Sequence, residues 1–93
     1  MQITYSFVDT SDNYVGHAES VVTDLTSVTY KVSTRPVTTI KDALDAQESL
    51  VCAMAKRFPH WEHISSAGSR LVADNFRGNS VRVVTEWIAR GES

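Results

Sequence analysis

The sequence contains a single cysteine, Cys52, among its 93 residues, with only two prolines and four glycines. One cysteine cannot form an internal disulfide, so the fold does not depend on an oxidising compartment. No apolar run approaches the roughly 20 residues needed to cross a bilayer. The first residues, Met1–Tyr5, lack the basic and apolar regions of a signal peptide, and no Asn-x-Ser/Thr sequon occurs. We therefore expect a cytoplasmic protein with no membrane contact.

Positive charge is scarce as well, because nine basic residues face eleven acidic ones. The acidic excess lies in residues 1–50, with a net charge of −4, whereas residues 51–93 carry +2. Proteins that bind nucleic acid through phosphates are usually strongly basic, so this balance argues against that class. A hydrophobic content of 42% with 22% charged residues is typical of a globular protein, and the length suits one domain.

Threonine and valine are concentrated at the start of the chain, where the first 39 residues hold eight of the nine threonines and seven valines. β-Branched side chains favour strands. Apolar and polar residues alternate over 3–7, as in a strand with one wet face. Turn formers at 9–13 and 24–27 separate it from two further strands, over about 14–22 and 28–32. Such short connections predict an antiparallel meander.

A helix is predicted over about 39–58. Thr38 or Thr39 caps its first turn, and Pro59 disfavours helical geometry at Phe58. Apolar residues at 3.6-residue spacing predict one buried stripe. That stripe comprises Ile40, Leu44, Val51, Met54, Ala55 and Phe58, with Ala43 and Leu50 at its edge and Gln47 near its middle, and Ala46 and Ala53 on the opposite side. The helix should cover one face of the sheet, because neither element can bury its apolar side alone.

Two positions in these elements have alternative interpretations. Gly16, inside the second strand, marks either a bulge or a close approach of another backbone. Gln47 either bonds to sheet backbone or water, or indicates that this part of the helix faces a second copy of the chain in a homodimer.

After Pro59 the pattern allows two topologies. Residues 61–64 suit a strand, 65–69 a loop, and 71–73 with 81–88 a hairpin rich in β-branched residues. The rival interpretation makes Ser80 the N-cap of a C-terminal helix. We favour the hairpin, and so predict a small α+β domain, residues 1–93, with an antiparallel sheet packed on one long helix.

No catalytic or metal-binding motif emerges. His60 and His63 form one His-x-x-His without the cysteine pair or further ligands that a structural zinc site needs. Cys52 has no base with a defined approach, so a small oligomeric enzyme that combines it with these histidines between subunits is only an alternative. We predict no catalytic residue, no metal ligand and no cofactor.

Arginine and aromatic residues of the second half offer the best candidate binding surface. Guanidinium groups beside aromatic rings suit an acidic protein surface, or equally phosphates and stacked bases. The candidate binding residues are Arg70, Phe76, Arg77, Arg82 and Trp87 near the predicted hairpin, with Tyr14 and Tyr30 of the meander.

The function that we expect is that of a non-enzymatic binding protein that modulates or inhibits a larger macromolecular partner. We expect this partner to be a protein, and the chain to be an accessory factor of a bacterium, a phage or a mobile element. The main alternative is a nucleic-acid adaptor that uses the arginine hairpin, and salt dependence would distinguish the two.

Overall fold

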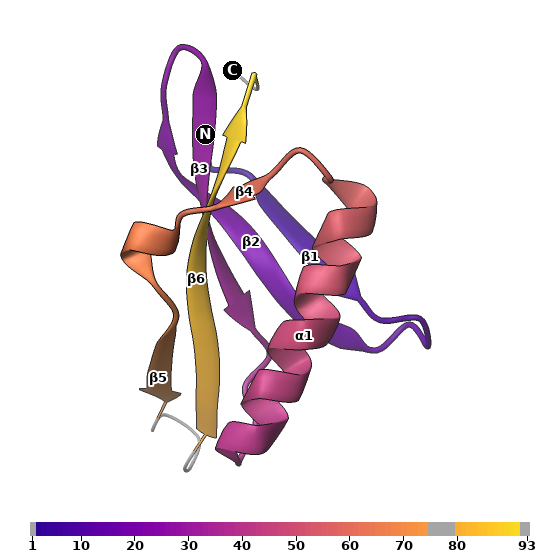
Figure 1. Cartoon of the computed structure of the whole chain (residues 1–93). Coiled ribbons are helices and arrows are strands. Elements are labelled where there is room, and N and C mark those ends of the chain that lie inside the picture. Colours follow the sequence, from indigo (N-terminus) through magenta and orange to yellow (C-terminus); the bar gives the residue numbers. More distant parts are fainter. Residues whose placement is uncertain (1, 75–79, 92–93) are drawn as a thin grey trace.

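The computed structural model describes residues 2–74 and 80–91, which form an antiparallel six-stranded sheet packed on one long helix (Figure 1). Its elements are β1 (Thr4–Val8), β2 (Tyr14–Thr23), β3 (Ser27–Thr34), α1 (Ile40–Arg57), β4 (Glu62–His63), the 3₁₀ helix η1 (Ser65–Ala67), β5 (Arg70–Asp74) and β6 (Ser80–Arg90). The strand order is β1-β2-β3-β6-β4, and β5 also pairs with β6. The predicted α+β class is therefore confirmed.

The N-terminal meander is confirmed, and it is bent by two bulges in β2. Phe7 pairs with Gly16 and Val8 with Tyr14, which leaves Val15 as the extra residue of the first bulge. The second irregularity lies between Ser20 and Val22, where β2 pairs with β3. Bulges increase the local twist of a strand, so β2 coils the sheet around α1.

The helix begins and ends where the sequence predicts. Thr39 is its N-cap, and its Oγ1 accepts a hydrogen bond from the Asp42 backbone N–H at 3.1 Å. Phe58 is the C-cap residue before Pro59, and its N–H still donates to the Met54 carbonyl. Capping of this kind satisfies backbone groups that a helix terminus leaves without partners.

The predicted buried stripe of α1 is confirmed at its C-terminal end, where Met54 is buried and Phe58 half-buried, but is wrong at its N-terminal end. Ile40 and Leu44 are 56% and 52% exposed, and Ala55 is exposed too. Besides Met54, the buried residues are Ala43 and Leu50, from the edge of the predicted stripe, and Ala46, from its opposite side, while Ala53 and Phe58 are half-buried. In the N-terminal half of α1 the small Ala43 and Ala46 therefore face the sheet, and Ala43 packs with Val37 and Val83.

Gly16 leaves room for the Leu50 side chain of α1 and for the neighbouring strand β3. A Cβ atom at this position would lie 2.4 Å from the Ser33 carbonyl oxygen and 2.7 Å from Leu50 Cδ2. Both distances are far shorter than van der Waals contact, so a side chain does not fit. The interpretation of Gly16 as a close-approach site is confirmed, and the bulge at Val15 lies beside it.

Aromatic rings fill the other end of the space between α1 and the sheet. The Trp61 ring is stacked between Tyr30, at 4.2 Å between ring centroids, and Phe58, at 4.3 Å. Tyr5 lies at 4.8 Å from Phe58 and closes the cluster from the side of β1. These rings form the core together with Phe7 and the aliphatic residues of the sheet.

The C-terminal half is a hairpin, as favoured, and the rival C-terminal helix is wrong. β5 and β6 pair in regular register from Arg70–Val84 to Asp74–Ser80, and residues 75–79 lie outside the described part. β4 is the predicted strand near Trp61 in a shorter form, only Glu62–His63. β3 occupies one edge of β6, while β4 and β5 share the other edge in succession (Figure 1).

Candidate functional site: a groove between strand β1 and helix α1

The predicted arginine and aromatic surface does not form one continuous patch in the described residues. Arg70 is exposed at the start of β5, and Arg82 is half-buried on β6. Side chains alternate between the faces of a strand, so Arg82 and Trp87, five positions apart, point to opposite faces. Trp87 packs against the core on the side of α1, and its Nε1 donates to Thr85 Oγ1 at 2.9 Å. The remaining two candidates, Phe76 and Arg77, lie outside the described residues.

The two candidate tyrosines are placed very differently. Tyr30 is 1% exposed and stacks on Trp61, so its ring belongs to the core. Tyr14 is 43% exposed, and its hydroxyl shares a 2.8 Å hydrogen bond with His17 Nδ1. Partial burial raises the pKa of the Tyr14 phenol above its usual value. Only Tyr14 of the pair remains available to a partner surface.

The face of the sheet away from α1 is mixed in charge. Lys31 lies directly between Glu19 on β2 and Glu86 on β6 in the strand register. Opposite charges at directly paired positions stabilise a sheet. Arg70 and Arg82 project from the same face of the β5–β6 pair. This alternation of charge is unlike the continuous basic surface that phosphate binding requires.

Metal-ligating side chains are not gathered in the part of the chain that the structure describes. No group of three or more His, Cys, Asp or Glu residues there is arranged to hold a metal ion. His63 instead lies beside Trp87, with 5.1 Å between the ring centroids. Among the same residues, no helix has the length and apolar content that a membrane span needs.

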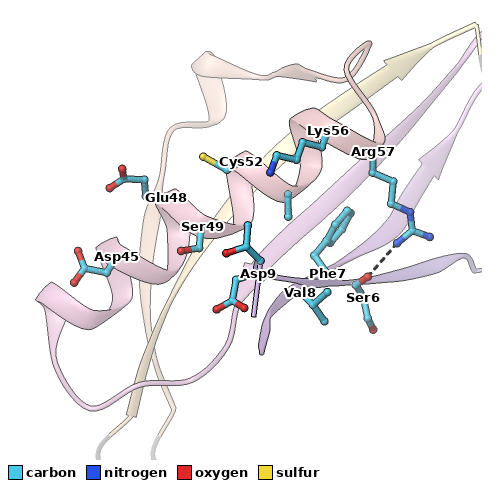
Figure 2. A pocket seen from close by; sticks show the side chains of 12 residues that line it. Ser6, Phe7, Val8, Asp9, Asp45, Glu48, Ser49, Cys52, Lys56 and Arg57 are labelled. Carbon is cyan, nitrogen blue, oxygen red and sulfur yellow. Dashed lines mark hydrogen bonds between the residues drawn. The ribbon is translucent and has the colours of Figure 1, made fainter. Parts of the chain in front are cut away.

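A groove of about 600 Å³ lies between the edge strand β1 and the flank of α1 (Figure 2). β1 and the start of the following loop form one wall, and α1 forms the other. Its lining residues are Ser6, Phe7, Val8, Asp9, Thr10, Asp45, Glu48, Ser49, Cys52, Ala53, Lys56 and Arg57. A neighbouring hollow of about 480 Å³ shares Asp9, Asp45 and Ser49 with it and continues toward Tyr14 and Arg35.

Strand β1 presents main-chain groups to this groove. The Ile3 carbonyl accepts a hydrogen bond from the Ser20 N–H. Alternate residues of β1 therefore direct their main-chain N–H and C=O groups to β2, and the residues between them direct these groups outward. The outward Ser6 carbonyl accepts a hydrogen bond from Arg57 Nη1 at 3.1 Å (Figure 2). An unpaired strand edge is a template for another strand, and Arg57 occupies part of this one.

Arg57 is held over the aromatic core. Its guanidinium carbon lies 5.1 Å from the ring centroids of Tyr5 and Phe58 and 5.5 Å from that of Phe7. A cation over an aromatic face is attracted by the electron density of the ring. The guanidinium therefore covers the end of the aromatic cluster and marks one end of the groove.

The loop after β1 is ordered by Asp9. Its Oδ1 accepts hydrogen bonds from the backbone N–H groups of Ser11, at 2.8 Å, and Asn13, at 2.9 Å. Hydrogen bonds from the Asn13 and then the Ser11 backbone hold the pKa of the Asp9 carboxyl below its usual value. The loop is thus built around an ionised carboxylate, which lies at the other end of the groove from Arg57 (Figure 2).

Cys52 is exposed in the middle of the groove wall formed by α1. None of the described lining residues is a histidine, so the groove places no imidazole beside the thiol. The sequence places Cys52 on the same arc of the helix as Asp45 and Lys56, and the structure brings all three to the groove. Sequence reasoning missed the groove itself, because its other wall comes from β1, some forty residues away.

No protein-family model, curated protein or solved structure matches this chain.

Proposed function

We propose that this chain is a non-enzymatic binding protein that takes up an extended segment of a larger protein in the β1–α1 groove and thereby modulates it. The observation that supports this most directly is the groove, where an edge strand and a helix flank border an open space of about 600 Å³. An extended peptide can join such an edge as an additional strand. Main-chain hydrogen bonds then supply affinity, and the side chains of the second wall supply specificity.

Arg57 sets a condition for this mode of binding. A new strand must take over the hydrogen bond that Arg57 Nη1 makes to the Ser6 carbonyl. One such exchange costs little, because the net contribution of a hydrogen bond is about 0.5–1.5 kcal/mol and the incoming N–H restores it. Arg57 thus protects the edge from unselective pairing and gives way to a segment that also fits the helix wall.

A protein segment suits the groove better than a nucleic acid does. Asp9, Asp45 and Glu48 all line it, and carboxylates repel phosphate groups. Val8, which is 47% exposed, and Ala53 offer apolar surface to side chains of a peptide. We therefore expect a protein segment in the groove, and sensitivity of the captured material to nuclease is the result that would favour a nucleic acid.

The test uses Cys52, the single cysteine of the chain, as a natural attachment point in the groove. A photo-activatable crosslinker on its thiol should capture a partner protein from a host lysate through one short stretch of that partner. Mass spectrometry identifies the crosslinked peptide. The matched control carries the same crosslinker on the variant Cys52→Ser/Leu25→Cys, because Leu25 is 91% exposed in the loop between β2 and β3, outside the groove.

The proposal requires a crosslink to one segment from Cys52 and none to that segment from position 25. In the protein labelled at Cys52, Ser49→Arg should abolish capture because it fills the groove, whereas Leu25→Arg should leave capture intact. Equal crosslinking from both positions would overturn the proposal. So would captured material that disappears after nuclease treatment, since that result would favour the nucleic-acid alternative.

A further inference from the structure

We infer, resting on the proposed function, that the segment in the groove carries a basic residue and an acidic group about four to six positions apart. The charges that line α1 are separated along its length. Figure 2 shows Asp45 and Glu48 at one end of the helix wall and Lys56 and Arg57 at the other, with Ser49 and Cys52 between them. An occupant with the complementary order of charge satisfies both ends at once.

The spacing follows from helix geometry. An α-helix rises about 1.5 Å per residue, so Glu48 and Lys56 are about 12 Å apart along the axis, and Asp45 and Arg57 about 18 Å. An extended chain advances about 3.3 Å per residue. Those two lengths correspond to about four and about six residues of an extended segment. A basic and an acidic residue at adjacent positions would reach only one end of the groove.

The acidic end keeps most of its charge available. Lys41 Nζ lies 3.9 Å from Asp45 Oδ2, but both side chains are largely exposed, and an exposed pair of this kind is weak. Asp9 also lies at this end, although its carboxylate is committed to the loop backbone. Asp45 and Glu48 are therefore the residues that select the basic side chain.

The middle of the groove sets the rest of the segment. Val8 and Ala53 are apolar, while Ser49 and Cys52 are small. Between its two charges the segment should therefore present compact β-branched residues, which also favour the extended conformation that pairing with β1 requires. We expect valine, isoleucine or threonine there.

The test is selection of binders from a random library of 12-residue peptides displayed on phage, against the immobilised full chain. Enriched peptides should share a lysine or arginine and an aspartate or glutamate separated by four to six positions. A synthetic binder with this spacing should bind about tenfold more tightly than its isomer with the two charges adjacent. Raising the salt concentration should reduce that ratio.

Charge reversal at one end supplies the matched control. The variant Asp45→Lys/Glu48→Lys should lose the preference for a basic residue, whereas Asp24→Lys/Glu62→Lys has the same net charge at exposed sites outside the groove and should keep it. Peptides that bind in the groove without any preferred charge spacing would overturn this inference and leave the proposed function standing. Selected peptides whose binding is unaffected by Cys52→Arg would overturn the proposed function itself.

Discussion

The two ends of the contact between α1 and the sheet are built in opposite ways. At the C-terminal end, Trp61 is inserted as a large flat ring between Tyr30 and Phe58. Toward the N-terminal end, the small Ala43 and Ala46 face the sheet, and the Leu50 side chain lies against Gly16. One end is filled by large rings, and the other by small residues packed closely together.

This difference shows that hydrophobicity alone does not identify the buried side of a helix. Large apolar side chains stabilise a contact by the surface that they remove from water, at roughly 25 cal/mol per Å². Small ones permit close packing, in which many atom pairs each gain a little dispersion energy. The two ends should therefore respond differently to mutation, the aromatic end to loss of volume and the small-residue end to its addition.

The largest effect is expected at the aromatic end, from Trp61→Ala. The substitution removes the ring between Tyr30 and Phe58 and leaves a cavity, so the free energy of unfolding should fall by about 3–5 kcal/mol. Urea denaturation followed by circular dichroism measures the change. Trp61→Phe, which refills much of the volume, should recover part of the loss. A fall below about 1 kcal/mol for Trp61→Ala would show that this end does not depend on the stack.

At the small-residue end, Gly16→Ala should destabilise by overpacking. The added Cβ meets the Ser33 carbonyl oxygen and Leu50 Cδ2, and insertion of a methyl group into a close-packed site typically costs about 1–3 kcal/mol. The double variant Gly16→Ala/Leu50→Ala should not restore stability, because the backbone clash with Ser33 remains. A neutral Gly16→Ala, measured by the same urea titration, would mean that Ser33 and Leu50 approach position 16 less closely than described.

The smallest effect is expected for the apolar residue that the sequence wrongly places in the core, Leu44. Its side chain is 52% exposed, so Leu44→Ser should change the free energy of unfolding by no more than about 0.5 kcal/mol. Leu50→Ala, on the buried side, should cost about 2–5 kcal/mol and serves as the comparison. If both changes cost the same, the orientation of α1 deduced from the structure would be wrong.

Much of the fold is predictable from the sequence because local signals agree with one another. Strand alternation in the first 34 residues, the cap at Thr39 and the stop at Pro59 each act within a few residues and need no distant partner. The orientation of α1 is not predictable in this way. Ile40 and Leu44 have the hydrophobicity of core residues, and the buried side is set by contacts with residues distant in the chain, such as that of Leu50 with Gly16 and that of Ala43 with Val83.

The candidate site is less predictable than the fold. The two described arginines of the predicted hairpin surface, Arg70 and Arg82, share one face of the β5–β6 pair, whereas Trp87 differs in parity from Arg82 along β6 and lies on the opposite face. Only one wall of the groove is predictable. The charges of α1 that line it are visible in the sequence, but the second wall exists because β1 becomes an edge strand beside the helix.

Strand β6 has a consequence for how the molecule is assembled. It pairs with β3, β4 and β5, all of which precede it in the chain. The residues that it pairs with on β3 are 51 to 63 positions away in the sequence, from the pair Ser33–Val84 to the pair Ser27–Arg90. Closing such distant pairs has an entropic cost that is met before the contacts form, and this slows folding. Until β6 arrives, β3 is an open edge and the aromatic rings lack part of their sheet. Because β6 joins three other strands, the sheet is complete only when β6 has paired, and we expect slow, cooperative folding for a chain of this length.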